Sequence, residues 1–307
     1  MDSISTLQNK EENIQKLAAA REAYSRSKAV LQINFWLSVI GAILVSAISI
    51  LLKSQAFATK IGIQPLDISF YASLYGVAVT VIDVFFLSKF IKTYRELGAL
   101  IQESFDTNVY SMPWNQVLVG EKTAPEDIYG LYEKHAKKAD LSKLKDWYPV
   151  NDSNLSGDPV SINVCQRTNL MWDMSLRKKA LLLSKLFLLV VVAAIIWLGV
   201  HFNVSLTQFL VGFVVPMLPL FVFVSKSVRS NTESISYINS IKSHVESLME
   251  KIQRGELDHQ SALLIARQLQ DAIFTHRNTT RPVSDWLYWK TKDNQEKRAK
   301  YAASSWG

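Results

Sequence analysis

The residues best suited to ligand chemistry lie in one short segment near the middle of the chain. The segment reads Cys165-Gln166-Arg167-Thr168-Asn169 and continues through Trp172 and Asp173 to Arg177. On a helix, Gln166, Asn169 and Asp173 share one face because they are three and four residues apart. Amides suit base edges and sugar hydroxyls, guanidinium groups bind phosphate through two hydrogen bonds, and an indole offers a stacking surface. Together these groups match the chemistry of a nucleotide ligand.

The same residues also fit a polar packing network that holds a helical domain together, and composition alone favours that alternative. Two further segments allow the same two interpretations. They contain Gln102, Glu103, Phe105 and Asp106, and then Arg277, Arg281, Asp285 and Trp286. Cys165 is expected to be a small buried residue rather than a nucleophile. Because it is the only cysteine, an intrachain disulfide and a cysteine-rich metal site are excluded.

The common catalytic signatures are absent from the sequence. No phosphate-binding glycine loop, dinucleotide-binding glycine motif, nucleophile elbow or HExxH zinc motif occurs, and the five histidines are scattered. We therefore expect a protein that is not an enzyme and that holds no cofactor and no metal.

Four long apolar runs determine where the candidate residues are held. They are Val30–Leu52, Ile68–Phe90, Leu186–Leu206 and Val204–Val224. A bilayer core of ~30 Å needs ~20 mostly apolar residues in a helix. In lipid every backbone polar group must be satisfied within the segment, so these runs are expected to be helices. The predicted fold class is an all-α integral membrane protein with four transmembrane helices and a cytoplasmic α-helical domain.

Charged and helix-breaking residues inside the runs form a second set of candidates. A carboxylate at Asp83 is costly in a membrane and is expected to face a pore, a bundle interior or a partner. The alternative is a protonated or water-reached group near the interface. Lys185 is expected to snorkel to the membrane surface or to pair with Asp83. Pro216 and Pro219 should kink the fourth helix, as a hinge or as a static bend.

The distribution of lysine and arginine predicts the topology. Of 34 basic residues, five lie in residues 1–29, thirteen in 89–179 and thirteen in 226–307. The positive-inside rule then places both termini and the central segment in the cytoplasm. The first 29 residues are polar and charged, which argues against a cleaved signal peptide. The net charge of +7 fits membrane orientation, attraction to anionic headgroups, and an anionic ligand.

Five segments follow from the runs and the charges. We expect a cytoplasmic amphipathic helix over 1–29 and transmembrane helices 1 and 2 over 30–90. A central cytoplasmic helical region should occupy 91–178, transmembrane helices 3 and 4 should occupy 179–225, and a cytoplasmic helical tail should occupy 226–307.

Apolar periodicity predicts long helices on the cytoplasmic side. The first and second runs should continue as helices beyond the membrane, toward the N-terminus through Leu17 and Ile14, and toward the C-terminus to Phe105. A seam of apolar residues follows the fourth run at coiled-coil spacing and should pack on the central region or on a neighbouring subunit. The seam consists of Ile238, Ile241, Val245, Leu248 and Ile252.

Shorter signals predict the remaining cytoplasmic helices. Thr123, Pro125 and Glu126 are typical of a capping box that begins a helix reaching Lys138. Trp147-Tyr148-Pro149 should end a second short helix. Gly255 and Asp258 should separate the seam from a final helix that reaches His276, and the last fifteen residues are expected to be disordered.

These motifs resemble those of the SMODS-associating four-transmembrane effectors. Leu100-Ile101-Gln102-Glu103-Ser104-Phe105-Asp106 and Met112-Pro113-Trp114-Asn115 resemble the "IQExFD…W" stretch that follows the second span of that family. The elements "WYP" and "CQRxNxxWDxxLR" are matched at Trp147-Tyr148-Pro149 and from Cys165 to Arg177. Arg281-x-x-Ser284-Asp285-Trp286-Leu287-Tyr288 resembles the closing basic–aromatic motif. The last element departs from the family at Pro282-Val283-Ser284-Asp285, where a hydrophobic-proline-aspartate sequence is usual.

The resemblance implies a role in CBASS anti-phage defence in bacteria. In such systems a cyclic-nucleotide synthase answers infection, and the effector binds the cyclic di- or oligonucleotide and permeabilises the inner membrane. It therefore implies a cyclic-nucleotide ligand for the candidate residues, a functional link to a synthase, and no nucleic acid polymer as partner. A homo-oligomer is expected because one subunit has little room for a pore. The alternative function is a constitutive ion channel or membrane scaffold without a nucleotide ligand.

Overall fold

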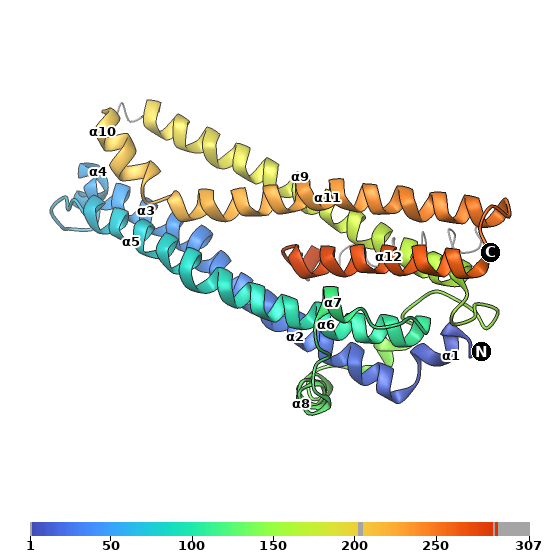
Figure 1. Ribbon diagram of the computed structural model, residues 1–307. Coiled ribbons are helices and arrows are strands. Elements are labelled where there is room, and N and C mark those ends of the chain that lie inside the picture. The colour runs from blue at the N-terminus through green and yellow to red at the C-terminus, as the bar shows by residue number, and fades with distance from the viewer. Residues whose placement is uncertain (1, 202–204, 285, 288–307) are drawn as a thin grey trace. The chain divides into compact units, whose positions relative to one another are not determined.

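The computed structural model describes residues 2–201, 205–284 and 286–287, and Figure 1 shows that they are mainly helical. Among these residues the only β contact is an isolated bridge between Ser3 and Leu155. The chain divides into two compact units. The polar unit comprises 1–28, 92–180 and 231–307, and the apolar unit comprises 29–91 and 181–230.

The chain goes from one unit to the other four times, and each boundary falls inside a helix. The boundaries after residues 28, 91, 180 and 230 lie within α2 (Glu11–Phe35), α6 (Ser88–Tyr110), α9 (Pro159–His201) and α11 (Leu218–Gln253), in that order. Helix therefore continues from the segments of the polar unit into the apolar runs, as the sequence predicts for the first and second runs.

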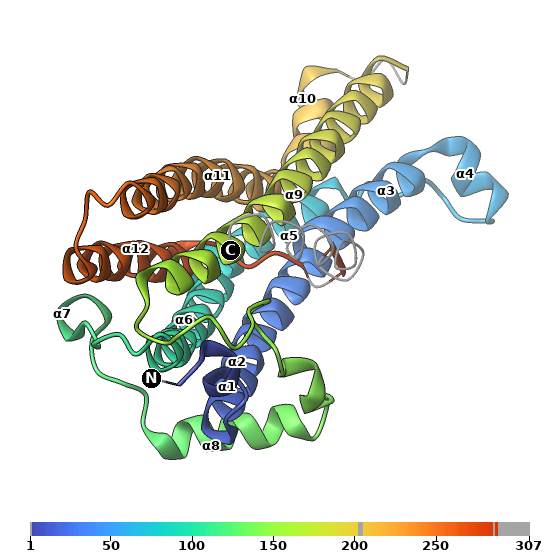
Figure 2. The same ribbon diagram turned by 90° about the vertical axis from the view of Figure 1, so that its right-hand side faces the viewer.

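The apolar unit is built from the long runs and several short elements. These are η1 (Trp36–Gly41), α3 (Ala42–Lys53), α4 (Gln55–Lys60), α5 (Ser69–Ile82), η2 (Asp83–Leu87), α10 (Leu206–Phe209) and η4 (Leu210–Val214). Figure 2 shows α3 and α5 joined through α4. Many large apolar side chains face outward, including Phe70, Leu189 and Trp197 with 70%, 66% and 61% of their surface exposed. Such a surface is stable in lipid rather than in water.

Among the described residues, three helices are long and apolar enough to cross a membrane. They are Glu11–Lys53, Ser69–Tyr110 and Pro159–Leu198. The predicted fourth run, Val204–Val224, is not one continuous helix, because a turn at 215–217 separates η4 from α11. Residues 202–204, where the third and fourth runs were predicted to meet, lie outside the described residues.

Pro216 accounts for this break. Proline lacks an N–H, so the carbonyl groups one turn earlier lose their donor. The hydroxyl of Ser73 donates to the carbonyl oxygen of Val211 over 2.9 Å and replaces one such bond. Gly76 allows the close approach, because a Cβ there would lie 2.5 Å from the carbonyl oxygen of Val215. Pro219 is the second residue of α11, a position where a missing N–H costs little.

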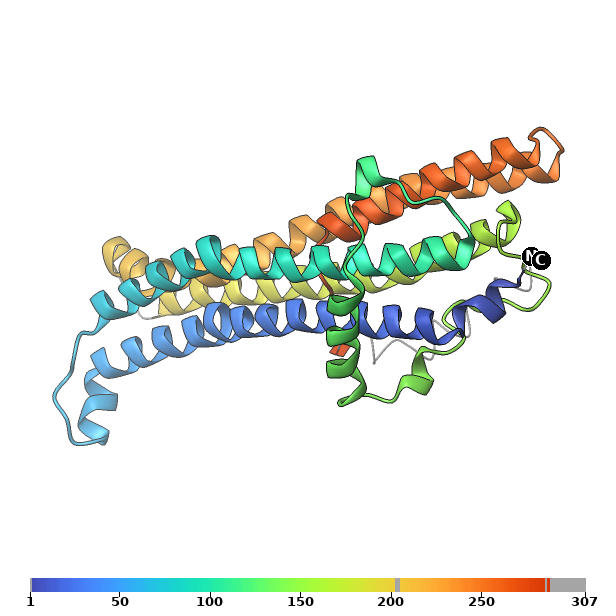
Figure 3. The same ribbon diagram turned by 60° about the horizontal axis from the view of Figure 1, so that its bottom comes forward.

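The polar unit packs α2, α6, α9, α11 and α12 (His259–Thr279) around a shared core. It also contains α1 (Ile4–Gln8), α7 (Gln116–Val119), α8 (Pro125–Ala136) and η3 (Leu141–Leu144). The predicted seam packs within the chain: Ile238, Ile241, Val245 and Leu248 are buried in this core with residues of α12. Figure 3 shows α12 beside the second half of α11, and α8 crossing α2, where Leu131 of α8 packs with Ala19 and Ala20.

Local signals at the ends of the short helices were partly right. Gly255 has a φ of 68°, and the side chain of Asp258 accepts from the Ser261 amide to cap α12, as predicted. The capping box at Thr123 is wrong, because Ala124 is the N-cap of α8 and the Thr123 hydroxyl bonds to no group. Pro125 at the first helical position favours the start of this helix without a side-chain cap. The second short helix is a 3-10 turn that ends at Leu144, before Tyr148.

Candidate functional site

Asp106 on α6 is the centre of a buried polar network in the polar unit. Its carboxylate is fully buried and accepts hydrogen bonds from three side chains. The hydroxyl of Tyr148 donates to Oδ1 over 2.6 Å, and Nε2 of Gln270 donates to Oδ2 over 3.2 Å. The guanidinium of Arg277 forms an ion pair with the same oxygen. Burial acts to lower the pKa of Arg277, but the charge and hydrogen bond of Asp106, together with Tyr148 and Tyr24, outweigh burial and raise that pKa.

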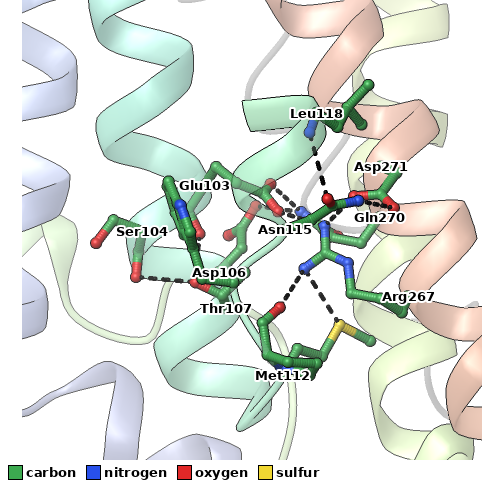
Figure 4. A network of polar contacts seen from close by, with 12 residues as sticks. Glu103, Ser104, Asp106, Thr107, Met112, Asn115, Leu118, Arg267, Gln270 and Asp271 are labelled. Atoms are coloured by element: carbon green, nitrogen blue, oxygen red, sulfur yellow. Dashed lines mark hydrogen bonds and ion pairs between the residues drawn. The ribbon is translucent and has the colours of Figure 1, made fainter. Parts of the chain in front are cut away.

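A second part of the network lies one turn earlier on α6, around Glu103 (Figure 4). Nη2 of Arg267 lies 2.7 Å from Oε1 of Glu103 and 2.7 Å from Oδ1 of Asp271. Gln270 donates to Oε2 of Glu103 over 2.8 Å, and Asn115 donates to Asp271 over 2.9 Å. Burial raises the pKa of Glu103, although Arg267 acts in the opposite direction. The network thus joins α6 to α12 through paired charges.

The central motif enters this network through its two amides. Gln166 donates from Nε2 to the carbonyl oxygen of Ala266 over 2.9 Å and to Oε1 of Gln270 over 3.2 Å. Asn169 donates to the hydroxyl oxygen of Tyr148 over 3.0 Å. Cys165, the neighbour of Gln166, is buried, and burial raises the pKa of its thiol. The motif therefore positions α9 against α12 and against the segment that carries Tyr148.

Asp173 forms a further cluster on the same helix. It pairs with Nε of Arg177 over 2.7 Å and with Nε2 of His276 over 2.7 Å. Burial acts to raise the pKa of Asp173, but Arg177 and His276 outweigh burial and hold that pKa below its usual range. Arg177 also donates to the carbonyl oxygen of Arg281 over 3.3 Å. This cluster ties the chain beyond α12 to α9.

The structure gives most of the predicted ligand residues partners inside the polar unit, as the packing alternative expects, and whether they also contact a ligand stays a prediction. The side chains with such bonds are those of Gln166, Arg167, Asn169, Asp173, Arg177 and Arg277. Gln166 and Arg177 are buried, whereas the other four are half-buried. Trp172, Gln102 and Arg281 are also half-buried, and Trp286 is exposed. Asp285 lies outside the described residues.

Sequence reasoning missed several members of the network. Arg267, Gln270 and Asp271 lie on α12 at helical spacing beside buried Ala262, Ala266 and Leu269, and Tyr148 was noted only as part of a motif. A polar residue that repeats on the apolar face of a helix is the signal that could have identified them. Within the described part of the chain, no three His, Cys, Asp or Glu residues form a group that could hold a metal.

A surface pocket of about 290 Å³ opens near the N-terminus of the polar unit. Its walls include Leu7, Ser111, Ser156 and His259, and none of the predicted ligand residues lines it. The pocket therefore shares no residues with the polar network.

The candidate membrane residues lie in the apolar unit. Asp83 is 1% exposed, so a water-reached carboxylate near the interface is wrong. The predicted pairing with Lys185 is also wrong. The partner is Lys226, whose Nζ lies 2.8 Å from Oδ2 of Asp83, while Lys185 is exposed on α9. A lysine just after the fourth apolar run can reach back into the bundle because its side chain is long.

Comparison with known proteins identifies the family. The family described as SMODS-associating 4TM effector domain matches residues 2–306. A probable CBASS effector molecule of Bacillus cereus (strain VD146) is 29% identical over 298 residues, which cover 95% of this chain and 94% of that protein. No solved structure matches the chain significantly. With its all-helical structure and its apolar helices able to cross a membrane, the chain belongs to the SMODS-associating 4TM effector family of membrane proteins.

Proposed function

We propose that this protein is a membrane effector of CBASS anti-phage defence that is activated by a cyclic di- or oligonucleotide. The polar unit binds the nucleotide on the cytoplasmic side. The apolar unit then rearranges, as part of a homo-oligomer, and permeabilises the inner membrane. The nucleotide comes from a cyclic-nucleotide synthase that responds to infection.

The family match over nearly the whole chain and the name of the Bacillus cereus relative support the role in defence. One structural observation supports the coupling of binding to the membrane. A continuous helix joins the two units at each of their four boundaries, after residues 28, 91, 180 and 230. A helix transmits a shift or rotation along its axis better than a flexible loop does.

Residues with accessible surface are the proposed ligand contacts. They are Arg167, Trp172, Arg281 and Trp286, which supply guanidinium groups for phosphates and indoles for stacking on bases. The buried members of the predicted set, Gln166 and Arg177, are proposed to hold the helices that present these contacts. Activation requires that the nucleotide bind the open arrangement more tightly than the closed one, because equal affinity shifts no equilibrium.

A thermal-shift screen of the full-length protein in detergent tests nucleotide binding. A ligand that binds the native state adds RT ln(1 + [L]/Kd) to its stability, about 2.7 kcal/mol at a hundredfold excess over Kd. The probes are cyclic dinucleotides and cyclic trinucleotides, with their linear counterparts as controls. A rise in the midpoint of unfolding with one cyclic nucleotide is expected. No rise with any cyclic nucleotide would contradict the proposal.

Arg167 allows a matched pair of variants. Its Nε donates to Oε1 of Glu246 over 3.2 Å, and Lys242 also pairs with Glu246, over 3.1 Å. A charge-assisted contact contributes roughly 1.5–3 kcal/mol, so Arg167→Ala should weaken nucleotide binding about tenfold or more. Lys242→Ala removes the other cation from Glu246 and should leave nucleotide affinity unchanged. Equal affinities in both variants and the wild type, measured by calorimetry, would return Arg167 to a packing role.

The proposed orientation places both termini and residues 91–178 in the cytoplasm. Single cysteines introduced on a Cys165→Ser background report the side of each segment through a membrane-impermeant maleimide. Lys60→Cys should label from outside intact spheroplasts, because its loop carries only two basic residues. Labelling of this position only after lysis would contradict the orientation.

The alternative function, a constitutive channel or scaffold, makes a different prediction. A constitutive channel conducts ions without any nucleotide, and a scaffold does not conduct with one. Release of a trapped dye from vesicles that carry the protein, with and without the cyclic nucleotide found in the screen, separates the three functions.

A further inference from the structure

A closed cluster of polar side chains lies inside the apolar unit. Its centre is Asp83, the first residue of η2. Oδ2 of Asp83 accepts a hydrogen bond from Nζ of Lys226 over 2.8 Å. Oδ1 accepts from Nδ2 of Asn34 over 2.6 Å and from the hydroxyl of Ser88 over 3.1 Å. Both carboxylate oxygens therefore have donors.

Further bonds close the cluster. Lys226 also donates to the hydroxyl oxygen of Ser88 over 3.0 Å, and Ser38 donates to Oδ1 of Asn34 over 2.7 Å. The members come from three stretches that are far apart in the sequence: Asn34 and Ser38 from α2 and η1, Asp83 and Ser88 from η2 and α6, and Lys226 from α11. The cluster thus links the first, second and fourth apolar stretches through one carboxylate.

The burial of the pair is unequal. Asp83 is 1% exposed, whereas the Lys226 side chain is 36% exposed. In apolar surroundings an ion pair is stable only while both partners are in place, because removal of one leaves an uncompensated charge. If the stretches separate, Lys226 can extend to the membrane surface. Asp83 has to find water or a proton. We therefore expect two distinct states of the apolar unit, one with the stretches joined by the ion pair and one with them separated, without stable intermediates.

The backbone beside the cluster is unusual in both of the first two stretches. The π-helical elements η1 (Trp36–Gly41) and η2 (Asp83–Leu87) include or adjoin its polar residues. π-Helical turns are rare and occur frequently at functional sites. The hydroxyl of Tyr75 donates to the carbonyl oxygen of Leu37 over 2.8 Å and so supports η1 from α5. These turns are positions at which a helix can return to regular winding when its neighbours move.

We propose that the Asp83–Lys226 ion pair, together with Asn34 and Ser88, is a latch that holds the apolar unit closed and that opens when the protein permeabilises the membrane. This proposal rests on the proposed function. To break the ion pair, another polar group must compete for Asp83 or Lys226. Water or an anionic lipid headgroup could do so as it enters between the separating stretches.

The test measures dye release from vesicles of phosphatidylethanolamine and phosphatidylglycerol that carry the full-length protein, without any nucleotide. The variant Lys226→Met removes the cation and should release dye about tenfold or more faster than the wild type, since the closed state loses its ion pair. Lys226→Arg retains a cation and should stay closed. The matched control is Lys53→Met, which breaks the exposed ion pair with Asp67, at 2.7 Å, in the same unit.

The outcomes distinguish the latch from the proposed function. Fast release by Lys226→Met with slow release by both other variants supports the latch, even if no cyclic nucleotide activates the wild type. Slow release by a folded Lys226→Met overturns the latch, and nucleotide-dependent release by the wild type would then leave the proposed function intact. Equal release by Lys226→Met and Lys53→Met also overturns it, because the effect would not be specific to the cluster.

A second variant covers the case in which Lys226→Met does not fold. Asp83→Asn combined with Lys226→Met leaves no charge in the cluster and keeps an amide able to bond Asn34 and Ser88. This double variant should be recovered from membranes in the amount of the wild type and should release dye without nucleotide. A folded double variant that stays closed overturns the latch.

Discussion

The hydroxyl of Tyr148 donates a hydrogen bond to Oδ1 of Asp106 over 2.6 Å, and both residues are buried. Tyr148 comes from the WYP motif and Asp106 from the FD motif, 42 positions apart in the chain. The same hydroxyl accepts from Asn169 of the central motif, and Asp106 pairs with Arg277 at the end of α12. Motifs that are separate in the sequence thus meet at one carboxylate in the polar unit.

Loss of the Tyr148 hydroxyl should destabilise the polar unit. Tyr148→Phe removes one donor from buried Asp106 and the acceptor of Asn169, so the free energy of unfolding should fall by roughly 1–3 kcal/mol. Chemical unfolding in detergent, followed by circular dichroism, measures the change. Tyr129→Phe is the matched control, because Tyr129 is 53% exposed on α8. Equal stabilities of the two variants would contradict the role given to this hydrogen bond.

The ion pair between Arg277 and Asp106 should contribute more than an ion pair at the surface. Arg277→Ala leaves Asp106 buried with its charge uncompensated and should cost about 3–5 kcal/mol. Arg254→Ala removes an arginine whose side chain is 67% exposed beside Glu250. That change should cost about 0–1 kcal/mol. The comparison fails if the two variants unfold at the same denaturant concentration.

The stability of the polar unit should fall in acid partly because of Asp173. Its pKa is lower in the folded protein than in the unfolded chain, where it is about 3.9. The stabilisation is therefore present above about pH 4 and is lost as the pH falls toward the folded pKa. Between pH 7 and pH 3 the midpoint of thermal unfolding should fall less in Asp173→Asn than in the wild type. Asp127→Asn, which changes an exposed residue of α8, should retain the wild-type dependence.

The thiol of Cys165 should be inert in the native protein. The residue is buried in the core of the polar unit, and burial raises its pKa, so little thiolate is available. A maleimide should label it only after denaturation. Rapid labelling of the native protein at pH 7 would show that α9 opens readily at this position.

Periodicity in the sequence predicted the long helices and their buried faces, because these depend on residues close together in the chain. The seam from Ile238 to Leu248 is buried as its spacing indicates, and Asp258 caps α12. Cys165 is a small buried residue, as expected. The partner of Asp83 could not be predicted in this way. Lys185 comes just before the third apolar run and Lys226 just after the fourth, so the sequence offers both as partners. Only the packing of the helices selects Lys226.

The central motif shows a second limit. Amides and arginines at helical spacing suit both a nucleotide and a packing network, and the sequence cannot distinguish them. Gln166 and Asn169 bond to Gln270 and Tyr148, which lie 104 and 21 positions away. Such partners become visible only when the fold is known. A kink at Pro216 was predicted from the missing N–H, whereas the full break of the helix and the compensating bond from Ser73 to Val211 were not.

Release of ions or dye from vesicles on addition of a cyclic nucleotide tests the central claim most directly. The wild-type protein, reconstituted in phosphatidylethanolamine and phosphatidylglycerol vesicles, should remain closed until the cyclic nucleotide that raises its thermal stability is added to the side proposed to carry the termini. Release should then follow, and Arg167→Ala should require about tenfold or more nucleotide for the same rate. A protein that binds the nucleotide in the thermal-shift screen but never releases dye, or releases it equally without nucleotide, would contradict the account.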